Sequence, residues 1–360
     1  MRIAHVDSGR SWRGGQAQVA YLLEGLLAAG HRVMLAAPKG APLAERGRSL
    51  GIEVIDFRPW GDLDAGATLG LGAAVKRFGA DIVHGHSAGA HLGAAMAGRL
   101  ARAPVVVTRR LDLPIGRSGF SRWKYRNGVR RYVAISQCVA RSLEAGGIEP
   151  GSIRVVYSGV PVGGPRAADP AARSAARRSL GLNDTEVAAV LVGAMTEQKG
   201  HDLAVTAMAQ VTAPLKLVFL GDGPDRAALE KQVAALDLGE RIVFAGFRKD
   251  VPALLPAFDF LVAPSRHEGL GTSVLEGMAA GLPVVATRVA EFEDVLDQGK
   301  AGRLVGAGDV PALALAMNEL VGDGALRARL GLASLERAGR YAVTEMVQGN
   351  IRVYDELRRG

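Results

Sequence analysis

The chain has 360 residues, of which 48% are apolar, and this favours two globular domains and excludes global disorder. A membrane-spanning helix needs roughly 18 to 20 apolar residues, and the best candidate, residues 88–107, is interrupted by Arg99 and Arg102. The single cysteine, Cys138, excludes an intrachain disulfide and a cysteine-cluster metal site. With no apolar segment typical of a signal peptide near its start, the sequence predicts a soluble, cytoplasmic protein.

The charge divides unevenly along the chain. Residues 1–160 carry 22 Lys and Arg against 11 Asp and Glu, a net charge of +11, whereas residues 161–360 carry 22 against 25, a net charge of −3. A basic half implies an anionic partner, which could be nucleic acid, a lipid surface or a phosphorylated substrate.

In the first half, short β-branched runs alternate with helix-length stretches. A strand at 2–6 and a helix at 17–28 are followed by strands expected at 32–37, 53–57, 81–84, 104–108, 131–135 and 153–156. Apolar strands separated by helices predict a parallel sheet covered on both faces. The glycines and prolines of residues 161–170 predict a linker.

The second half repeats this pattern. Strands are expected at 187–192, 215–220, 242–244, 258–263 and 283–286, with three more helices from about residue 310 to the end. We therefore predict two doubly wound, Rossmann-like α/β domains facing a central cleft, over residues 1–162 and 163–340. Ligands of such folds bind beyond the carboxyl ends of the strands. The last segment, 341–360, is a helix that could pack on either domain.

The strongest chemical signal begins at Ser265, where the sequence reads Ser-Arg-His-Glu-Gly-Leu-Gly-Thr-Ser. A strand ends before it, a glycine-containing turn follows, and a helix is expected to begin near Thr272. Free backbone N–H groups and the helix dipole make such a turn an anion site. Glu268 precedes the turn and Glu276 follows eight residues later. Two carboxylates beside a phosphate site suit a ligand that carries both phosphates and vicinal hydroxyls.

With the following residues, Gly-Met-Ala-Ala-Gly-Leu-Pro at 277–283, this motif resembles the donor site of the family-four retaining glycosyltransferases, which have the two-domain GT-B fold. The resemblance covers nearly the whole chain. It includes Gly14-Gly15, Lys199-Gly200 and the segments 220–224, 263–265 and 302–305. Residues 109–131 are similar to the corresponding region of lipopolysaccharide-core-type members.

The resemblance implies a role for each matching residue and a nucleotide-sugar donor linked to UDP, GDP or ADP, with no cofactor. Glu276 would hold the ribose hydroxyls, and Glu268 would contact the donor sugar as a catalytic-site residue. Lys199 would pair with the diphosphate and stabilise the leaving group. The other donor contacts implied are Gly14, Gly15, Phe247, Arg248, Gly269, Leu270, Gly271 and Thr272.

The chain departs from the family pattern at two positions. Ala194 stands where the family usually has an arginine, a second cation on the diphosphate. Arg110 stands where many members have a histidine. One hypothesis joins the two departures, in which Arg109 or Arg110 supplies the missing positive charge.

Two further patterns have competing interpretations. His84 and His86 share one face of a strand end. They lack a third metal ligand within sequence reach, which leaves packing or a polar contact with donor or acceptor, and His86 is a catalytic candidate. Asp62-Leu63-Asp64 matches the DxD pattern of metal-dependent glycosyltransferases. Here, however, the pattern lies in a loop of a fold in which that motif is not expected. We expect no bound metal.

The segment 109–131 interleaves basic and aromatic residues. Such a segment suits an anionic membrane or a glycolipid acceptor, and also single-stranded nucleic acid. Family members often act on lipid-linked acceptors, which favours the membrane or acceptor interpretation, a location on the inner face of the cytoplasmic membrane, and no nucleic-acid partner. The candidate residues are Arg109, Arg117, Arg122, Trp123, Lys124 and Arg126.

The leading hypothesis is transfer of a sugar to an acceptor hydroxyl, on a lipid-linked glycan or lipopolysaccharide core. The alternatives are a nucleotide-sugar epimerase of the same fold and a non-enzymatic protein that binds membranes or nucleic acid through its basic half. A dinucleotide-dependent oxidoreductase is excluded, because residues 8–15 do not read G-x-G-x-x-G.

Overall fold

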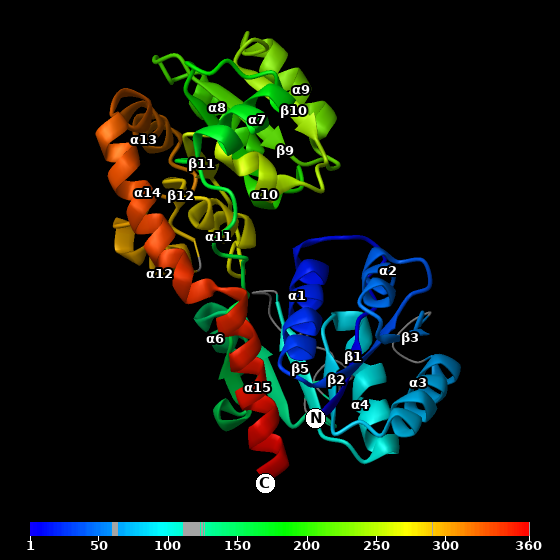
Figure 1. The fold of residues 1–360 in the computed structure, drawn as a ribbon. Helices are drawn as coiled ribbons and strands as arrows, with labels where there is room; N and C mark the ends of the chain where they lie inside the picture. Colours follow the sequence, from blue (N-terminus) through cyan, green and yellow to red (C-terminus); the bar gives the residue numbers. More distant parts are fainter. Residues whose placement is uncertain (60–63, 111–122, 124, 126, 290, 360) are drawn as a thin grey trace. The chain divides into compact units, whose positions relative to one another are not determined.

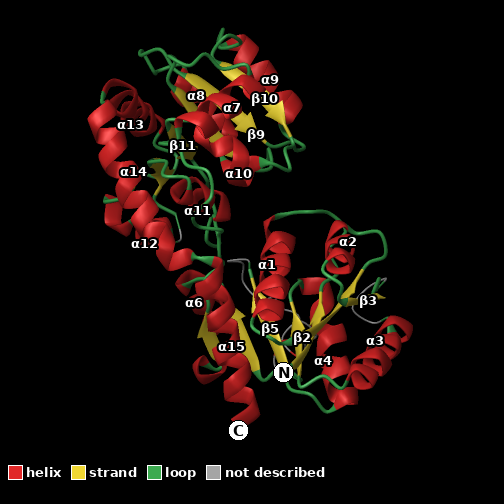
Figure 2. Ribbon diagram, viewed as in Figure 1, coloured by secondary structure: helices red, strands yellow, loops and turns green. Residues whose placement is uncertain are grey.

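The computed structural model describes residues 1–59, 64–110, 123, 125, 127–289 and 291–359, and these divide into two compact units. Unit 1 comprises Met1–Gly159 together with Val343–Gly360, and unit 2 comprises Val160–Ala342. In each unit helices cover a parallel β-sheet (Figures 1 and 2). This confirms the predicted fold class of two Rossmann-like α/β domains.

Unit 1 contains a seven-stranded parallel sheet in the order β3-β2-β1-β4-β5-β6-β7. Its strands are β1 (Arg2–Val6), β2 (Arg32–Ala37), β3 (Glu53–Asp56), β4 (Ile82–Gly85), β5 (Val105–Arg109), β6 (Arg131–Ala134) and β7 (Ile153–Val155). Its helices are α1 (Gly14–Ala28), α2 (Pro42–Ser49), α3 (Ala65–Phe78), α4 (His91–Ala101), α6 (Gln137–Ala145) and α15 (Val343–Arg359). All seven strands were predicted within one or two residues from their short apolar runs, although the edge strands β3 and β7 are only partly buried.

Helix α15 brings the end of the chain back to unit 1. The sequence had left open whether this last helix packs on the first or the second domain, and it packs on the first. A Cβ added at Gly25 of α1 would lie 2.3 Å from Val347 of α15, so the two helices pack closely. Glu356 near the other end of the helix pairs with Arg154 at 2.9 Å and Arg131 at 3.4 Å. Apolar packing and ion pairs therefore attach α15 along its length.

Unit 2 contains a six-stranded parallel sheet in the order β10-β9-β8-β11-β12-β13. Its strands are β8 (Ala188–Val192), β9 (Lys216–Leu220), β10 (Ile242–Gly246), β11 (Phe260–Ala263), β12 (Val284–Thr287) and β13 (Gly302–Val305). Its helices are α7 (Pro170–Leu180), α8 (His201–Met208), α9 (Arg226–Ala235), α10 (Val251–Leu254), α11 (Thr272–Ala279), α12 (Phe292–Val295), α13 (Val310–Gly322) and α14 (Gly324–Ala338).

Two features of unit 2 differ from the sequence prediction. The edge strand β13 was not predicted, because its four residues include Gly302 and Arg303 and lack a continuous apolar run. The predicted linker, residues 161–170, belongs to unit 2: Ala167 N donates to Ala280 O at 2.9 Å, and Pro170 begins α7. The prolines and glycines correctly predicted an irregular segment. They did not indicate that this segment packs against the rest of unit 2.

Candidate active site

At the carboxyl edge of the unit 2 sheet, Lys199 and Glu268 form an ion pair. Lys199 ends the 3-10 helix η3 (Glu197–Lys199), and Glu268 lies in the loop after β11. Lys199 Nζ donates to Glu268 Oε1, and Ser265 Oγ donates to the same oxygen at 3.0 Å. The Glu268 side chain is only 8% exposed, so these two partners replace the water that a surface carboxylate would have. Two residues predicted to contact the donor are thus in mutual contact.

Gly200 is what allows η3 to approach the β11 loop. It has φ +68°, which favours glycine, and an added Cβ would lie 2.1 Å from the carbonyl oxygen of Pro264. Any other residue would separate the two loops and so the Lys199–Glu268 pair. The family-type sequence Lys-Gly at this point therefore has a direct steric reason.

Polar contacts hold the same two loops together. Arg266 forms two hydrogen bonds to the Asp202 carboxylate, at 2.8 and 2.6 Å. Gln198 O accepts from Arg266 N at 2.8 Å, and Gln198 Nε2 donates to the carbonyl of His267 at 2.9 Å. The bidentate arginine and the backbone contacts fix the position of the loops on either side of the ion pair.

Helix α11 begins at Thr272, as predicted, with the neighbouring residues of the motif shaping its start. Gly271 adopts φ +78°, and its Cβ would lie 2.3 Å from the ring of Phe292. Leu270 is 1% exposed and anchors the turn in the core. The N-cap residue of this helix is Gly271, which has no side chain to cap it, and the first turn contains no acid, so the N-terminal N–H groups can receive an anion. Gly269 lies directly before Leu270 in the same turn.

Glu276, one turn into α11, is poorly hydrated. Burial raises the pKa of this carboxyl to about 7, and the nearby Lys199 acts in the opposite direction. This excludes the alternative of a fully solvated surface glutamate. A carboxyl held near its point of titration can accept hydrogen bonds when charged and donate one when neutral.

Phe247, which is exposed, and Arg248, which is half-buried, follow β10. The Phe247 side chain is 57% exposed. Arg248 pairs with Asp250 through two hydrogen bonds of 2.8 and 2.7 Å. A fixed guanidinium beside an exposed aromatic ring gives a flat surface on which a planar base can stack.

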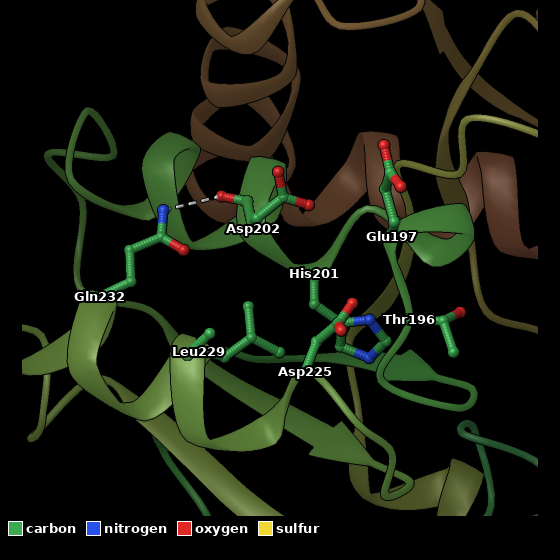
Figure 3. A pocket seen from close by; sticks show the side chains of 8 residues that line it. Thr196, Glu197, His201, Asp202, Asp225, Leu229 and Gln232 are labelled. Atoms are coloured by element: carbon green, nitrogen blue, oxygen red, sulfur yellow. Dashed lines mark hydrogen bonds between the residues drawn. The ribbon is translucent and has the colours of Figure 1, made fainter.

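A pocket of about 240 Å³ lies between α8, α9 and η3 (Figure 3). His201 lines it, is 1% exposed, and has no hydrogen-bond partner for either ring nitrogen among the described residues. Burial, assisted by Lys199, lowers the pKa of His201 to about 4, so the ring is neutral near pH 7. At about 30 Å³ per water the pocket has room for several waters. None of the predicted donor residues lines this pocket.

In unit 1, Arg110 follows β5 and lies against the start of α1. A Cβ at Gly15 would be 3.5 Å from Arg110 Cδ, and Arg110 Nε is buried with no partner among the described residues. Burial lowers the pKa of Arg110 to about 10, with the Asp7 carboxylate acting against this, so the side chain stays cationic near pH 7. The N-cap residue of α1, Arg13, does not cap the helix with its side chain, and the first turn contains no acid. Both features favour an anion here.

Gly14 and Gly15 correct the sequence prediction. The helix was expected to start at residue 17, but these two glycines are the first two residues of α1. Glycine is a poor helix former, so the sequence pattern did not indicate that the helix begins at these residues. The Asp7 carboxylate, which accepts from Gly9 N at 2.7 Å and from Gln16 Nε2 at 3.2 Å, orders the loop before this helix.

His86 lies beside a third histidine that sequence reasoning missed. His5 of β1 pairs with His84 in the sheet register, and its Nδ1 is 2.9 Å from His86 Nε2. All three rings are buried, and ring nitrogens of the three lie within 4.8 Å of one another. His84 and His86 indeed have no third ligand close to them in the sequence, but the fold brings one beside them from a neighbouring strand. The signal was His5 itself, at the end of a neighbouring strand but 81 residues away.

Part of the basic segment is defined by the structure. Arg109 donates to Tyr125 OH at 2.6 Å, and its guanidinium lies 5.6 Å from the centre of that ring. The Trp123 side chain is 49% exposed. The remaining candidates lie outside the described residues: Arg117, Arg122, Lys124 and Arg126.

Asp64, the last residue of the DxD pattern, has a structural role. Asp64 caps α3 by accepting from Ala67 N at 2.9 Å, a common role for aspartate at this position. Asp62 lies outside the described residues. Among the described helices, none combines the length and apolar character that crossing a bilayer would require.

Two family models match the chain, one in each half. The model of Glycosyltransferase Family 4 matches residues 12–163, and that of Glycosyl transferases group 1 matches residues 186–323. They cover most of unit 1 and most of unit 2, including Lys199, Glu268 and Glu276.

Several characterised proteins are similar in sequence. The lipopolysaccharide core biosynthesis glycosyltransferase LpsE of Rhizobium meliloti is 37% identical over 39% of this chain and 41% of its own length. The mannosyltransferase LpsB of the same organism is 32% identical over 52% and 56%. The chain thus spans about half the length of these two relatives. The 2-deoxystreptamine glucosyltransferase of Streptomyces kanamyceticus is 33% identical over 69% of this chain and 70% of its own length.

Solved structures share the fold over the whole chain. The Anabaena protein Alr3699/HepE, solved with UDP and glucose, superposes with a TM-score of 0.87 at 21% identity, covering 99% of this chain and 100% of its own. WaaG, a glycosyltransferase involved in lipopolysaccharide biosynthesis, gives 0.74 at 16% identity, covering 99% and 100%. The fold is GT-B, and the chain belongs to the family-four glycosyltransferases.

Proposed function

We propose that this protein transfers a sugar from a nucleotide-diphosphate donor to an acceptor hydroxyl with retention of configuration. The observation that carries the proposal is the grouping at one sheet edge of Lys199, Glu268 and the uncapped start of α11, with Glu276 one turn further on. A cation beside free helix N–H groups suits a diphosphate. Nearby carboxylates suit the hydroxyls of a sugar and a ribose.

The electrostatic part of catalysis falls to Lys199. As the bond between sugar and diphosphate breaks, negative charge develops on the leaving phosphate, and a preorganised cation lowers the energy of that state. In the ligand-free pair this charge is directed at Glu268. Donor binding would redirect Lys199 to the phosphate and release Glu268 for the sugar hydroxyls.

Arg110 is proposed as the second cation of the reaction, compensating for Ala194. Its partly buried guanidinium keeps an unused Nε–H donor among the described residues and lies at an uncapped helix start. His86, next to it in the fold, would act by orienting this arginine, since its ring is only 3% exposed. Gly14 and Gly15 would keep the start of α1 open to the ligand.

Acceptors of the lipopolysaccharide-core type are proposed from the named relatives and from the basic first half. An acceptor held on a lipid would bring Trp123 and Arg109 to the inner face of the cytoplasmic membrane. Flotation with vesicles of anionic lipid should recover the protein, and vesicles of neutral lipid should not. Equal recovery with both would contradict the membrane contact.

A nucleotide-binding panel tests the donor site. UDP, GDP, ADP and NAD are titrated with and without magnesium, using the wild type, Glu276→Ala and the exposed control Glu230→Ala. We expect one nucleoside diphosphate to bind without magnesium and Glu276→Ala to weaken it about tenfold, the effect of losing a charged hydrogen bond. The control should bind as the wild type does. Tight binding of NAD, or of no nucleotide, would refute the proposal.

An acceptor requirement separates transfer from epimerisation. A transferase releases its nucleoside diphosphate at an appreciable rate only when an acceptor is present, whereas an epimerase converts its nucleotide sugar alone. Incubation with each candidate nucleotide sugar, with and without membrane glycolipid, distinguishes these outcomes.

A further inference from the structure

The carboxyl edge of the unit 1 sheet has a polar layer on one face. In the parallel register His5 stands beside His84, and His84 beside Val106 of the next strand. Residues two apart on a strand point to the same side. One face therefore presents polar side chains from β1, β4 and β5 and the residues just beyond them: His5, Asp7, His84, His86, Thr108 and Arg110.

Helix α15 places one hydroxyl against this layer. Tyr354 is fully buried, and its hydroxyl is 2.6 Å from His84 Nδ1. The other ring nitrogen of His84, Nε2, is 2.7 Å from Thr108 Oγ1. The chain Tyr354–His84–Thr108 thus connects the C-terminal helix to the end of β5, two residues before Arg110.

The hydrogen-bond inventory requires both partners of His84. Burial, with smaller contributions from His5 and Arg110, lowers the pKa of His84 well below its usual value, so the ring is neutral. A neutral imidazole has one N–H donor and one bare nitrogen. Each of the two hydroxyls can serve either nitrogen, and together they satisfy the ring and fix its orientation.

The second histidine pair completes the layer next to Arg110. His5 Nδ1 and His86 Nε2 bond to each other, which leaves one nitrogen on each ring without a partner among the described residues. Two free ring nitrogens are fewer than the three protein ligands of a zinc site. The hydrogen bonds therefore favour a neutral, metal-free network that supports the arginine.

We propose that Tyr354 is a positioning residue. Its hydroxyl fixes the ring of His84, which through Thr108 and through the His86 ring, 4.0 Å away and tilted by 39°, sets the position of Arg110. The proposal rests on the catalytic role of Arg110 in the proposed function. In this role helix α15 does more than cover the core. Tyr354, 244 positions after Arg110 in the sequence, would influence the position of the Arg110 guanidinium.

The test compares two neighbouring residues of α15. Tyr354→Phe removes the hydroxyl and keeps the ring, leaving a buried nitrogen of His84 unpaired. Val353→Ala, at a residue 2% exposed, removes buried methyl groups and touches no hydrogen bond of the layer. We expect Tyr354→Phe to lower kcat about tenfold while the dissociation constant for the nucleoside diphosphate is unchanged. Val353→Ala should lower the melting temperature and leave kcat near that of the wild type.

Side-chain ¹⁵N NMR reads the network without an activity assay. The His84 ring and Arg110 Nε signals should shift in Tyr354→Phe and not in Val353→Ala. Unshifted signals, equal loss of kcat in both variants, or stoichiometric zinc in the purified protein would overturn the inference. A wild type without transferase activity would instead refute the proposed function, and the NMR comparison would still decide the role of Tyr354.

Discussion

The two units can be compared at the same part of the same fold, the carboxyl edge of a parallel sheet. The buried polar side chains at this edge differ between the units. In unit 1 the edge holds three buried imidazoles that bond to one another or to hydroxyls and to no acid among the described residues, and burial keeps them neutral. In unit 2 the buried Glu268 side chain forms an ion pair with Lys199. A charge persists at a buried sheet edge only where an opposite charge is within reach.

The same difference predicts opposite responses to pH. Burial lowers the pKa of His5 from 6.5 to about 3, so acid favours the unfolded state, which can bind the proton. Burial raises the pKa of Glu276 to about 7, so alkali favours the unfolded state, which can release the proton. His201 in unit 2 responds as His5 does and opposes Glu276. Unit 1 should therefore be the more acid-sensitive of the two.

Acidification should give the largest effect, because three buried histidines of unit 1 contribute to it together. Between about pH 6.5 and about pH 5, His5 alone should lower the opening free energy of unit 1 by about 2 kcal/mol, at 1.36 kcal/mol for each pH unit. His84 and His86 act in the same direction. Hydrogen exchange of the β1 and β4 amides, corrected for intrinsic rates, measures this, with β12 amides of unit 2 as the internal control. Equal loss of protection in both sheets would contradict the comparison.

Lys199→Ala should have the next largest effect. It removes the partner of Glu268 and leaves a buried carboxylate with Ser265 alone, at a cost of about 3 kcal/mol. Turnover should fall about 100-fold or more, because the leaving phosphate loses its cation. Lys231→Ala, an exposed lysine of α9, is the control for stability and rate. A variant with wild-type turnover would remove Lys199 from the mechanism.

The architecture followed from the sequence because buried parallel strands are short, continuous apolar runs. All seven strands of unit 1 and five of the six in unit 2 were predicted from such runs, within about two residues. The strand β13 was missed because Gly302 and Arg303 interrupt its apolar pattern. The start of α1 was missed because Gly14 and Gly15 are poor helix formers whose place is set by tertiary contacts.

The candidate site was predictable where its residues form one segment and hidden where the fold assembles it. Glu268, Glu276 and the helix start at Thr272 lie within nine residues, and their motif was evident. The pairing of Lys199 with Glu268 joins positions 69 apart. His5 and Tyr354 reach His84 from opposite ends of the chain, and no local pattern marks either of them. Contacts between distant strands and helices depend on the register, which the sequence does not display.

Glu276→Gln tests the alkaline side of the comparison. The wild-type carboxyl takes up a proton on folding between about pH 4.5 and about pH 7, so its contribution to stability decreases as the pH rises through that interval. Relative to the wild type, the variant should gain up to about 3 kcal/mol from about pH 5 to about pH 8. Urea unfolding at both pH values measures the gain, with Glu230→Gln on α9 as the exposed control. A difference that does not change with pH would place Glu276 in a hydrated environment.

Arg110→Ala should have the smallest of these effects and the most specific signature. The guanidinium belongs to unit 1, whereas the residues proposed to hold the nucleotide belong to unit 2. Its loss should lower turnover about 30-fold and change nucleotide affinity less than about threefold, because a cation that acts on developing charge stabilises the transition state more than the bound ground state. Arg109→Ala separates the two arginines, since Arg109 is already bonded to Tyr125. If Arg110→Ala lowered nucleotide affinity as much as turnover, Arg110 would be a binding residue. If turnover were unchanged in both variants, neither arginine would take part in catalysis.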